Sequence, residues 1–297
     1  MTSPAETPVP APAILGRIVS AQRAEITEYH IYSAIASALP EGHNRQTLLK
    51  IAGEELSHYQ VWKRYTRMDT GPDRARILWY TGMARILGIT FTLKLMENIE
   101  KRAQRADPAI VAGFPEYAGI IADEEEHEQA LIALIDEERL KYVGSVVLGL
   151  NDALVEFTGT LAGLTFAIQN TQLIAVTGLI MGVAASLSMG ASEYLSRRSE
   201  DGEQSPGKAA VYTGLTYVAT VILLILPFML IGNPFSALLC TLSCAVLIIL
   251  FFTFYISVAK DLPFYRRFGE MLVISLGIAA VSFVIGMAIR VFLSTGA

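Results

Sequence analysis

Two short stretches, Glu55-Leu56-Ser57-His58 and Glu124-Glu125-Glu126-His127, decide the fold of the N-terminal part of this chain. Each stretch places a carboxylate three residues before an imidazole, so on a helix both side chains share one face about one turn apart. Glu25 and Glu97 lie in two further segments of helical periodicity. One Glu from each of two helices and one Glu-x-x-His from each of two others is the ligand pattern of a dinuclear carboxylate bundle.

Apolar residues recur at helical spacing throughout this part of the chain and predict four long helices. We expect them near residues 14–39, 42–68, 82–106 and 109–142, separated at Pro40-Glu41-Gly42, Thr70-Gly71-Pro72 and Asp107-Pro108. Residues 69–81 are too many for a tight turn and are interpreted as a crossover between helices two and three. One long crossover distinguishes ferritin-like bundles from simple up-and-down bundles.

The remainder of the chain is too apolar for a soluble domain. The whole sequence has 53% hydrophobic and only 17% charged residues, and its mean hydropathy is +0.45. Five apolar segments, each long enough to cross a hydrocarbon core of about 30 Å, lie near residues 145–168, 172–196, 209–232, 235–259 and 268–293. The predicted fold class is therefore all-α, a ferritin-like four-helix bundle followed by a five-helix transmembrane domain.

The predicted domains are a disordered, proline-containing tail at residues 1–13, a bundle at 14–142 and a membrane domain at 143–297. The tail lacks the basic start and apolar core of a secretory signal. Lys and Arg gather before span one (Arg139, Lys141), between spans two and three (Arg197, Arg198, Lys208) and between spans four and five (Lys260, Arg266, Arg267). The positive-inside rule then predicts a multi-pass protein of the cell's inner membrane, with a cytoplasmic bundle and an external C-terminus.

Charge and cysteine content exclude two classes of function. The formal net charge is −5 and neither half is basic, so a broad face for nucleic-acid phosphates is missing and no nucleic-acid partner is expected. Both cysteines, Cys240 and Cys244, lie inside one apolar run. A disulfide framework or a thiolate zinc site in the bundle is therefore excluded, and the bundle belongs in a reducing compartment.

The candidate metal ligands of the bundle carry a balanced charge. Four carboxylates and two neutral imidazoles would compensate two divalent cations, and oxygen and imidazole ligands without thiolates suit iron or manganese. Glu100, three residues after Glu97, could add a fifth carboxylate. The predicted set is Glu25, Glu55, His58, Glu97, Glu100, Glu124 and His127, holding two iron ions, or manganese, per bundle.

Other polar residues of the bundle have simpler interpretations. A helix cannot turn every neighbouring carboxylate inward, so we interpret Glu28, Glu54, Glu125, Glu126 and Glu128 as exposed charges. His30 and His43 are expected at the surface or in outer contact with the site. Tyr29, Tyr32 and Tyr59 are interpreted as core residues, with donation of a hydrogen bond to a ligand, or relay of an electron, as the alternative.

Residues 14–142 resemble the rubrerythrin branch of the ferritin-like superfamily. The resemblance rests on Glu25 followed seven residues later by Tyr32, and on Glu97-x-x-Glu100. It implies oxidation of Fe(II) by oxygen or peroxide at a di-iron centre, that is, ferroxidase or peroxidase activity. The chain lacks the paired Cys-x-x-Cys of a rubredoxin module, so peroxidase turnover would need an outside electron donor.

The membrane domain has its own acidic residues. Asp152 and Glu156 lie four residues apart in the first span, where a carboxylate costs roughly 2.5 to 3.5 kcal/mol at the bilayer centre and tends to mark an ion path. We expect both to face a bundle interior. In the second span, Gly178, Gly182, Ser186 and Gly190 form a packing stripe beside Met181, Ala185, Met189 and Glu193. We assign Met189 and Glu193 to metal passage and Met181, Cys240 and Cys244 to packing; Glu270 is equally an interface charge or a proton acceptor.

The stretches Gly149–Glu156 and Ser188–Ser196 resemble the vacuolar iron transporter family, and the whole arrangement resembles the bacterial membrane-bound ferritin family. The resemblance implies a five-span homodimer that exports Fe(II), or Mn(II), from the cytoplasm by proton exchange, with Asp152 and Met189 at the translocation site. The connection Arg197–Lys208 is too short for the helical metal-binding insertion of plant and protist members. The predicted function is iron export; the alternative is a membrane-tethered oxidoreductase, and a storage protein is disfavoured because five spans oppose a closed soluble shell.

Overall fold

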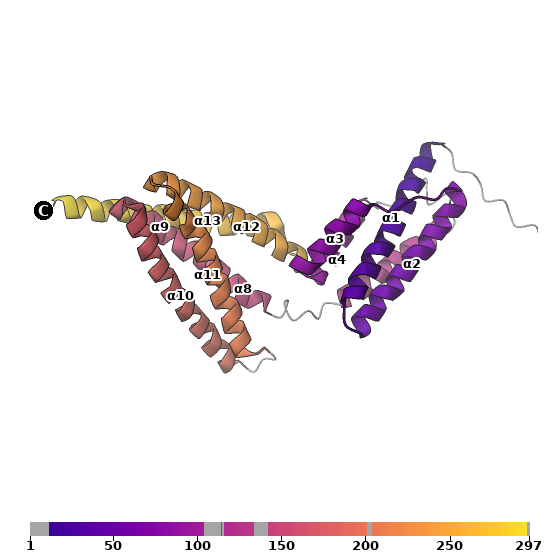
Figure 1. The fold of residues 1–297 in the computed structure, drawn as a ribbon, viewed down its shortest axis with the longest axis horizontal. Coiled ribbons are helices and arrows are strands. Elements are labelled where there is room, and N and C mark those ends of the chain that lie inside the picture. The colour runs from indigo at the N-terminus through magenta and orange to yellow at the C-terminus, as the bar shows by residue number, and fades with distance from the viewer. Residues whose placement is uncertain (1–11, 104–113, 115, 134–141, 201–203, 296–297) are drawn as a thin grey trace, which may run out of the picture. The chain divides into compact units, whose positions relative to one another are not determined.

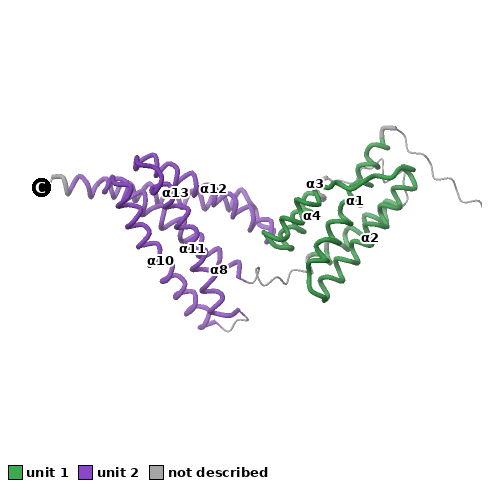
Figure 2. Tube along the Cα trace, in the orientation of Figure 1, with its two compact units in different colours: residues 1–137 green, residues 138–297 purple. Residues whose placement is uncertain are grey.

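A computed structural model describes residues 12–103, 114, 116–133, 142–200 and 204–295. The described residues form helices and contain no strand, which confirms the predicted all-α class. The chain divides into two compact units, residues 1–137 and 138–297 (Figure 2). Most of the predicted tail, residues 1–11, lies outside the described residues.

Unit 1 is built from five described helices (Figure 1): α1 (Pro12–Ala38), α2 (His43–Thr66), α3 (Arg74–Leu87), α4 (Ile89–Ala103) and α6 (Tyr117–Ala133). Helix α1 packs along α2 and also against α3, while α6 contacts both α2 and α4. One hydrophobic core cluster of unit 1 contains Ile18, Trp62, Tyr65, Phe114 and Ile120. These apolar faces hold α1, α2 and α6 together, and those three helices carry five of the seven predicted metal ligands: Glu25, Glu55, His58, Glu124 and His127.

Two predicted boundaries in unit 1 are wrong. The expected crossover at residues 69–81 contains the start of α3, because the Asp73 carboxylate accepts hydrogen bonds from the backbone N–H groups of Ala75 and Arg76 and so caps a helix there. The expected helix at 82–106 is divided at Gly88, whose φ of 98° is left-handed and suits glycine. Of the expected helix at 109–142, only Tyr117–Ala133 is a described helix.

Unit 2 begins with a helical segment in three parts: α8 (Val143–Asp152), the π-helical turn η1 (Ala153–Phe157) and α9 (Thr158–Ile168). Four longer helices follow: α10 (Thr171–Ser199), α11 (Pro206–Leu230), α12 (Pro234–Ala259) and α13 (Phe264–Thr295). All four are long and apolar enough to cross a membrane. They correspond to predicted spans two to five, while the role of the interrupted segment 143–168 as a further span stays a prediction.

Small residues bring the helices of unit 2 close together. At Gly182 on α10, a Cβ atom would lie 2.4 Å from Val221 of α11, and at Gly286 on α13 it would lie 2.3 Å from the Gly163 carbonyl oxygen of α9. Such close backbone approach is typical of helix packing in membranes. The predicted small-residue stripe therefore does pack, since Gly178, Gly182 and Ser186 are buried.

Candidate functional site

Four acidic and imidazole side chains from three helices converge inside unit 1. Glu25 comes from α1, Glu55 and His58 from α2, and Glu124 from α6, and one ligand atom of each lies within 4.8 Å of the others. Only 6% of Glu25, 1% of Glu55 and 4% of His58 is exposed. The structure thus brings together four of the seven predicted ligands in a largely buried group.

His127 of α6 lies at the edge of this group. Its Nδ1 atom is 3.3 Å from Glu55 Oε1 and 3.8 Å from Glu124 Oε2. The rings of His58 and His127 have centroids 5.9 Å apart. Both imidazoles therefore border the same carboxylates, and we refer to Glu25, Glu55, His58, Glu124 and His127 as the acidic cluster.

The acidic cluster contains polar atoms that form ion-pair contacts at most and no hydrogen bond among the described residues. Each of its five residues has one buried atom without a hydrogen-bond partner among the described residues: Glu25 Oε2, Glu55 Oε2, His58 Nδ1, Glu124 Oε1 and His127 Nδ1. A buried polar atom left unsatisfied costs about 1–3 kcal/mol. Carboxylate oxygens and imidazole nitrogens are ligands for divalent iron and manganese, so the residues fit a metal site.

The outer nitrogens of both imidazoles are held by carboxylates. His58 Nε2 lies 3.1 Å from Asp123 Oδ2, and His127 Nε2 lies 2.9 Å from Glu54 Oε2. An imidazole whose Nε2–H donates to a carboxylate directs the lone pair of Nδ1 at a metal and is a more basic ligand. The interpretation of Glu54 as an exposed charge is therefore wrong, and the sequence analysis missed Asp123.

A buried tryptophan orients one of the carboxylates. Trp62 Nε1 donates a hydrogen bond to Glu25 Oε1 at 3.1 Å, and the indole is only 1% exposed. The ring of Trp62 also lies close to those of Phe114 and Tyr117. Because Oε1 is engaged by the indole, Oε2 is left for the acidic cluster.

Ionisation in the acidic cluster follows from burial and mutual attraction. Burial raises the pKa of Glu25 well above its ordinary value, against the influence of His58. Burial also opposes ionisation of Glu55, but the adjacent imidazoles of His127 and His58 outweigh it and lower the pKa of Glu55 to about 2. The same attractions overcome burial at the imidazoles and raise the pKa of His58 to about 11 and that of His127 to about 10.

The third predicted helix does not complete this group in the described structure. Glu97 is half-buried on α4 and is not among the four residues whose ligand atoms converge. Glu100 belongs to α4, but its side chain lies outside the described residues. The assignment of Glu97 and Glu100 as ligands stays a prediction.

Most of the simpler interpretations in unit 1 match the burial of the side chains. Glu125, Glu126, His30 and His43 are exposed, while Tyr32 and Tyr59 are buried and Tyr29 is half-buried. Glu28 differs, because it is only 3% exposed. The side chain of Glu128 lies outside the described residues.

In unit 2, the acidic pair of the first predicted span lies at a π-helical turn. Asp152 is the last residue of α8, and Glu156 lies within η1. Ser275 of α13 donates a hydrogen bond to the Leu154 carbonyl oxygen at 3.1 Å, and the Thr158 hydroxyl donates to the same oxygen. These side chains bind a carbonyl group within the turn. Single π turns occur frequently at functional sites.

The two carboxylates of this pair differ in their surroundings. Tyr217 of α11 is fully buried and donates a hydrogen bond to Glu156 Oε2 at 2.9 Å. Glu156 nevertheless lies exposed on the surface of the single unit, and Asp152 is half-buried. The expectation that both face the interior of the unit is therefore wrong for Glu156.

The acidic residue of α10 has two partners. Glu193 is only 4% exposed, accepts a hydrogen bond from Ser145 Oγ of α8 at 2.7 Å, and forms an ion pair with Arg197 Nε at 2.9 Å. Met189 is half-buried against the apolar core, whereas Met181 is 42% exposed. The pair was not predicted because Arg197 was expected in the connection after the second span; it lies on α10, where the four-residue spacing from Glu193 favours such a pair.

Comparison with known families identifies one part of the chain. Residues 143–203 match the VIT family. The matched segment contains Asp152, Glu156, Met189 and Glu193, and the match confirms the resemblance to vacuolar iron transporters for these residues. No curated protein matches the chain. The rubrerythrin-like resemblance of residues 14–142 stays a prediction, while the match and the four apolar helices indicate a multi-pass membrane protein.

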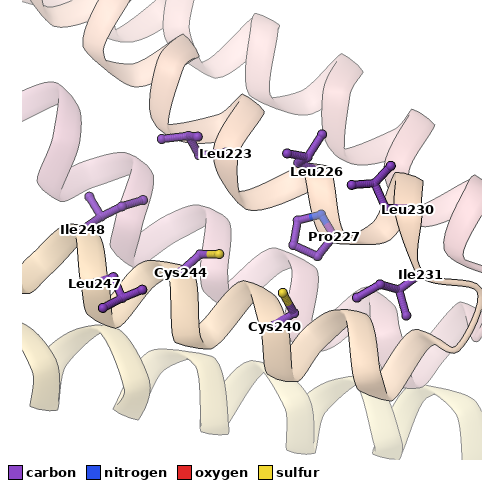
Figure 3. A pocket seen from close by; sticks show the side chains of 9 residues that line it. All are labelled: Leu223, Leu226, Pro227, Leu230, Ile231, Cys240, Cys244, Leu247 and Ile248. Atoms are coloured by element: carbon purple, nitrogen blue, oxygen red, sulfur yellow. The ribbon is translucent and has the colours of Figure 1, made fainter.

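The two cysteines lie in a different environment. Cys240 and Cys244 of α12 face an open groove of about 340 Å³ between α11 and α12, shared with Pro227 and aliphatic side chains (Figure 3). The groove lining is wholly apolar. Cys244 also packs against the apolar core of unit 2, while the packing role of Cys240 stays a prediction.

Proposed function

We propose that this chain is a membrane transporter that exports Fe(II), or Mn(II), from the cytoplasm, and that unit 1 binds the same metal. The observation that carries the proposal is the acidic pair at the π turn, with Asp152 directly before the turn and Glu156 within it, inside the segment that matches the VIT family. Carboxylates are costly within a bilayer and are retained where they bind an ion or a proton.

In this proposal the transport path comprises Asp152, Glu156, Met189 and Glu193. The carboxylates bind the divalent ion, and Met189 offers a soft thioether beside them. A carboxylate that releases a divalent cation can take up a proton, which supports exchange of metal for protons across the membrane.

The exposure of Glu156 supports a homodimer. A carboxylate on the lipid-facing surface of a span would be unfavourable, and such residues almost always face a protein interior or a water-filled cavity. Glu156 is exposed on the single unit. A second copy that covers Glu156 would remove it from lipid and place two acidic pairs at one interface.

The proposed role of unit 1 is to hold two iron ions at the acidic cluster, with Glu97 and Glu100 as further ligands. Iron bound by such ligands supplies Fe(II) oxidation chemistry with oxygen or peroxide. The chain's own residues prepare the site: Asp123 and Glu54 orient the two imidazoles, and Trp62 holds one oxygen of Glu25. Unit 1 would then report iron supply to the transporter.

Proteoliposomes with an imposed pH gradient test the proposed transport. We expect the wild-type protein to move Fe(II) and Asp152→Ala to abolish this movement, while Asn151→Ala, the neighbouring half-buried position, serves as the matched control. Undiminished Fe(II) movement by Asp152→Ala would contradict the proposed path.

A membrane-tethered oxidoreductase is the second candidate, and the buried acidic cluster is the observation that favours it. In that case the spans serve as an anchor and the chemistry belongs to unit 1 alone. Wild-type protein that oxidises Fe(II) but moves none across the membrane would favour this candidate over export.

A further inference from the structure

Helix α3 turns a set of large apolar side chains away from unit 1. Leu78, Trp79 and Ile86 are 74%, 68% and 76% exposed, respectively. The opposite face is anchored, because Tyr80 and Met83 are buried and α3 packs against α1. An amphipathic helix on a soluble domain usually turns its apolar side inward. In α3 only some of the apolar side chains point inward.

The exposed side chains form one surface. Residues 78, 82 and 86 follow one another at four-residue intervals and Trp79 is adjacent, so all four positions share a helix face. Gly82, between Leu78 and Ile86, has nothing within 4 Å of a Cβ position. We call Leu78, Trp79, Gly82 and Ile86 the outer face of α3.

The charges of α3 all have one sign. Arg74, Arg76 and Arg85 are its only charged residues, and Arg74 and Arg85 are exposed. Arg76 lies over the ring of Tyr80, with 5.9 Å from the guanidinium carbon to the ring centroid. On a helical projection, Arg74 and Arg85 fall beside Leu78 at one margin of the outer face. The outer face is thus apolar with a basic margin.

The start of α3 is fixed to the rest of unit 1. The Asp73 backbone N–H donates a hydrogen bond to Thr27 Oγ1 of α1 at 2.9 Å, and the Asp73 carboxylate caps the helix. The Asp73 carboxylate is therefore engaged at the N-terminus of α3. A firmly anchored helix presents its outer face as a formed surface.

We infer that the outer face of α3 binds the surface of an anionic phospholipid bilayer, with Leu78, Trp79 and Ile86 at the interface and Arg74 and Arg85 at the headgroups. Helices that lie in a membrane interface combine Trp, Phe or Leu on an apolar face with Lys or Arg on the polar face. Tryptophan is also enriched at the boundary between bilayer and water.

The bilayer is favoured over another protein as the occupant because the same chain spans one. Four helices of unit 2 are long and apolar enough to cross a membrane, and only nine residues, 134–142, separate α6 from α8 in the sequence. Because so few residues separate unit 1 from unit 2 in the sequence, the bilayer is at a high effective concentration near unit 1, so a weak intrinsic affinity is enough. The basic margin complements anionic headgroups.

Tryptophan fluorescence of the full chain in nanodiscs tests this inference. The chain has two tryptophans, and Trp62 is buried, so the difference between wild type and Trp79→Phe isolates Trp79. The nanodiscs contain phosphatidylglycerol and phosphatidylcholine, with or without brominated acyl chains. We expect brominated lipid to quench Trp79 emission and aqueous acrylamide to leave it largely unquenched.

Two results would overturn the inference. Quenching of Trp79 by acrylamide but not by brominated lipid would place the outer face of α3 in water. Quenching by neither agent would show that protein covers Trp79. If this protection from both quenchers appears only in nanodiscs that hold two copies of the chain, a second copy is the occupant.

Matched variants separate the two parts of the surface. Leu78→Glu is expected to abolish quenching by brominated lipid, whereas Leu49→Glu, at an exposed leucine of α2, should leave it unchanged. Replacing Arg74 and Arg85 with Gln should shift the docking equilibrium by about fivefold per arginine, since each basic residue near an anionic surface contributes about that factor. Equal quenching in purely zwitterionic nanodiscs would overturn the anionic part of the inference. None of these readouts depends on metal transport.

Discussion

His127 Nε2 lies 2.9 Å from Glu54 Oε2, the carboxylate that directly precedes Glu55 on the facing helix. The relationship is reciprocal, because His58 Nε2 lies 3.1 Å from Asp123, which directly precedes Glu124. The imidazole of each Glu-x-x-His motif therefore contacts the acidic residue that directly precedes the other motif. This exchange ties α2 to α6 and directs Nδ1 of both imidazoles at the acidic cluster.

Glu54 and Asp123, the carboxylates that contact the two imidazoles, should control metal affinity without binding metal themselves. We expect Glu54→Ala to weaken metal binding by about 10- to 100-fold, the usual effect of removing a carboxylate that orients a histidine ligand. Titration calorimetry with Mn(II) or anaerobic Fe(II) measures the change. Glu125→Ala, at an exposed position on α6, is the control; equal affinities for the two variants would contradict the role of Glu54.

Trp62 should contribute to the stability of the metal-free protein. In Trp62→Phe the Oε1 atom of Glu25 loses its donor inside the core, which should lower the free energy of unfolding of unit 1 by about 1–3 kcal/mol. Thermal unfolding in detergent measures the difference. Trp79→Phe makes the same exchange at an exposed site and should change the stability by no more than about 0.5 kcal/mol; similar losses in both variants would argue against the hydrogen bond.

Metal binding should release protons and strengthen as the pH rises. The pKa values of about 11 for His58 and about 10 for His127 mean that both imidazoles are protonated at neutral pH, and a ligand must lose its proton. Calorimetry in buffers of different ionisation enthalpy counts the released protons. Binding without proton release at neutral pH would show that the imidazoles are not ligands.

The same shifts predict the opposite trend for the metal-free protein. Because the pKa of each imidazole is raised by folding from an ordinary 6.5, the stabilisation is fully present below about pH 6.5 and is lost as the pH rises through about 10 to 11. Chemical denaturation of metal-free protein between pH 6.5 and 10 should therefore show decreasing stability. Stability that rose with pH over this interval would contradict the assignment.

The contributions of Glu193 and Arg197, the ion pair of α10, to the free energy of unfolding should depend on each other. Arg197→Ala leaves the buried Glu193 carboxylate without its cation and should cost roughly 1–3 kcal/mol, whereas adding Glu193→Gln to that variant should recover part of the loss. A double-mutant cycle by thermal unfolding gives the coupling energy. Strictly additive losses would show that Arg197 and Glu193 do not depend on each other.

Four residues of the acidic cluster were predictable because a three-residue spacing fixes the face of a helix. Glu55, His58, Glu124 and His127 needed no more than this rule. Glu54 and Asp123 were not predictable, since their contacts join two helices and depend on how those helices are rotated against each other. Their position immediately before each motif was the only signal.

Local chemistry explains the boundaries that the sequence analysis missed. Asp73 follows Pro72 and could have been recognised as a helix cap, which would have revealed α3 and its exposed Trp79. The division at Gly88 depends on a left-handed φ, which an isolated glycine in an apolar pattern does not predict. The π turn that begins after Asp152 includes Leu154, whose carbonyl oxygen accepts a hydrogen bond from Ser275, more than a hundred residues away along the chain.

Transport and metal content measured on the same Asp152→Ala preparation separate the proposed path in unit 2 from metal binding in unit 1. We predict that this variant, reconstituted into proteoliposomes with a pH gradient, moves no Fe(II) while its acidic cluster binds as much metal as in wild type. In contrast to Asp152→Ala, Glu55→Ala should lose metal binding in unit 1. Fe(II) movement by Asp152→Ala at the wild-type rate would contradict the account.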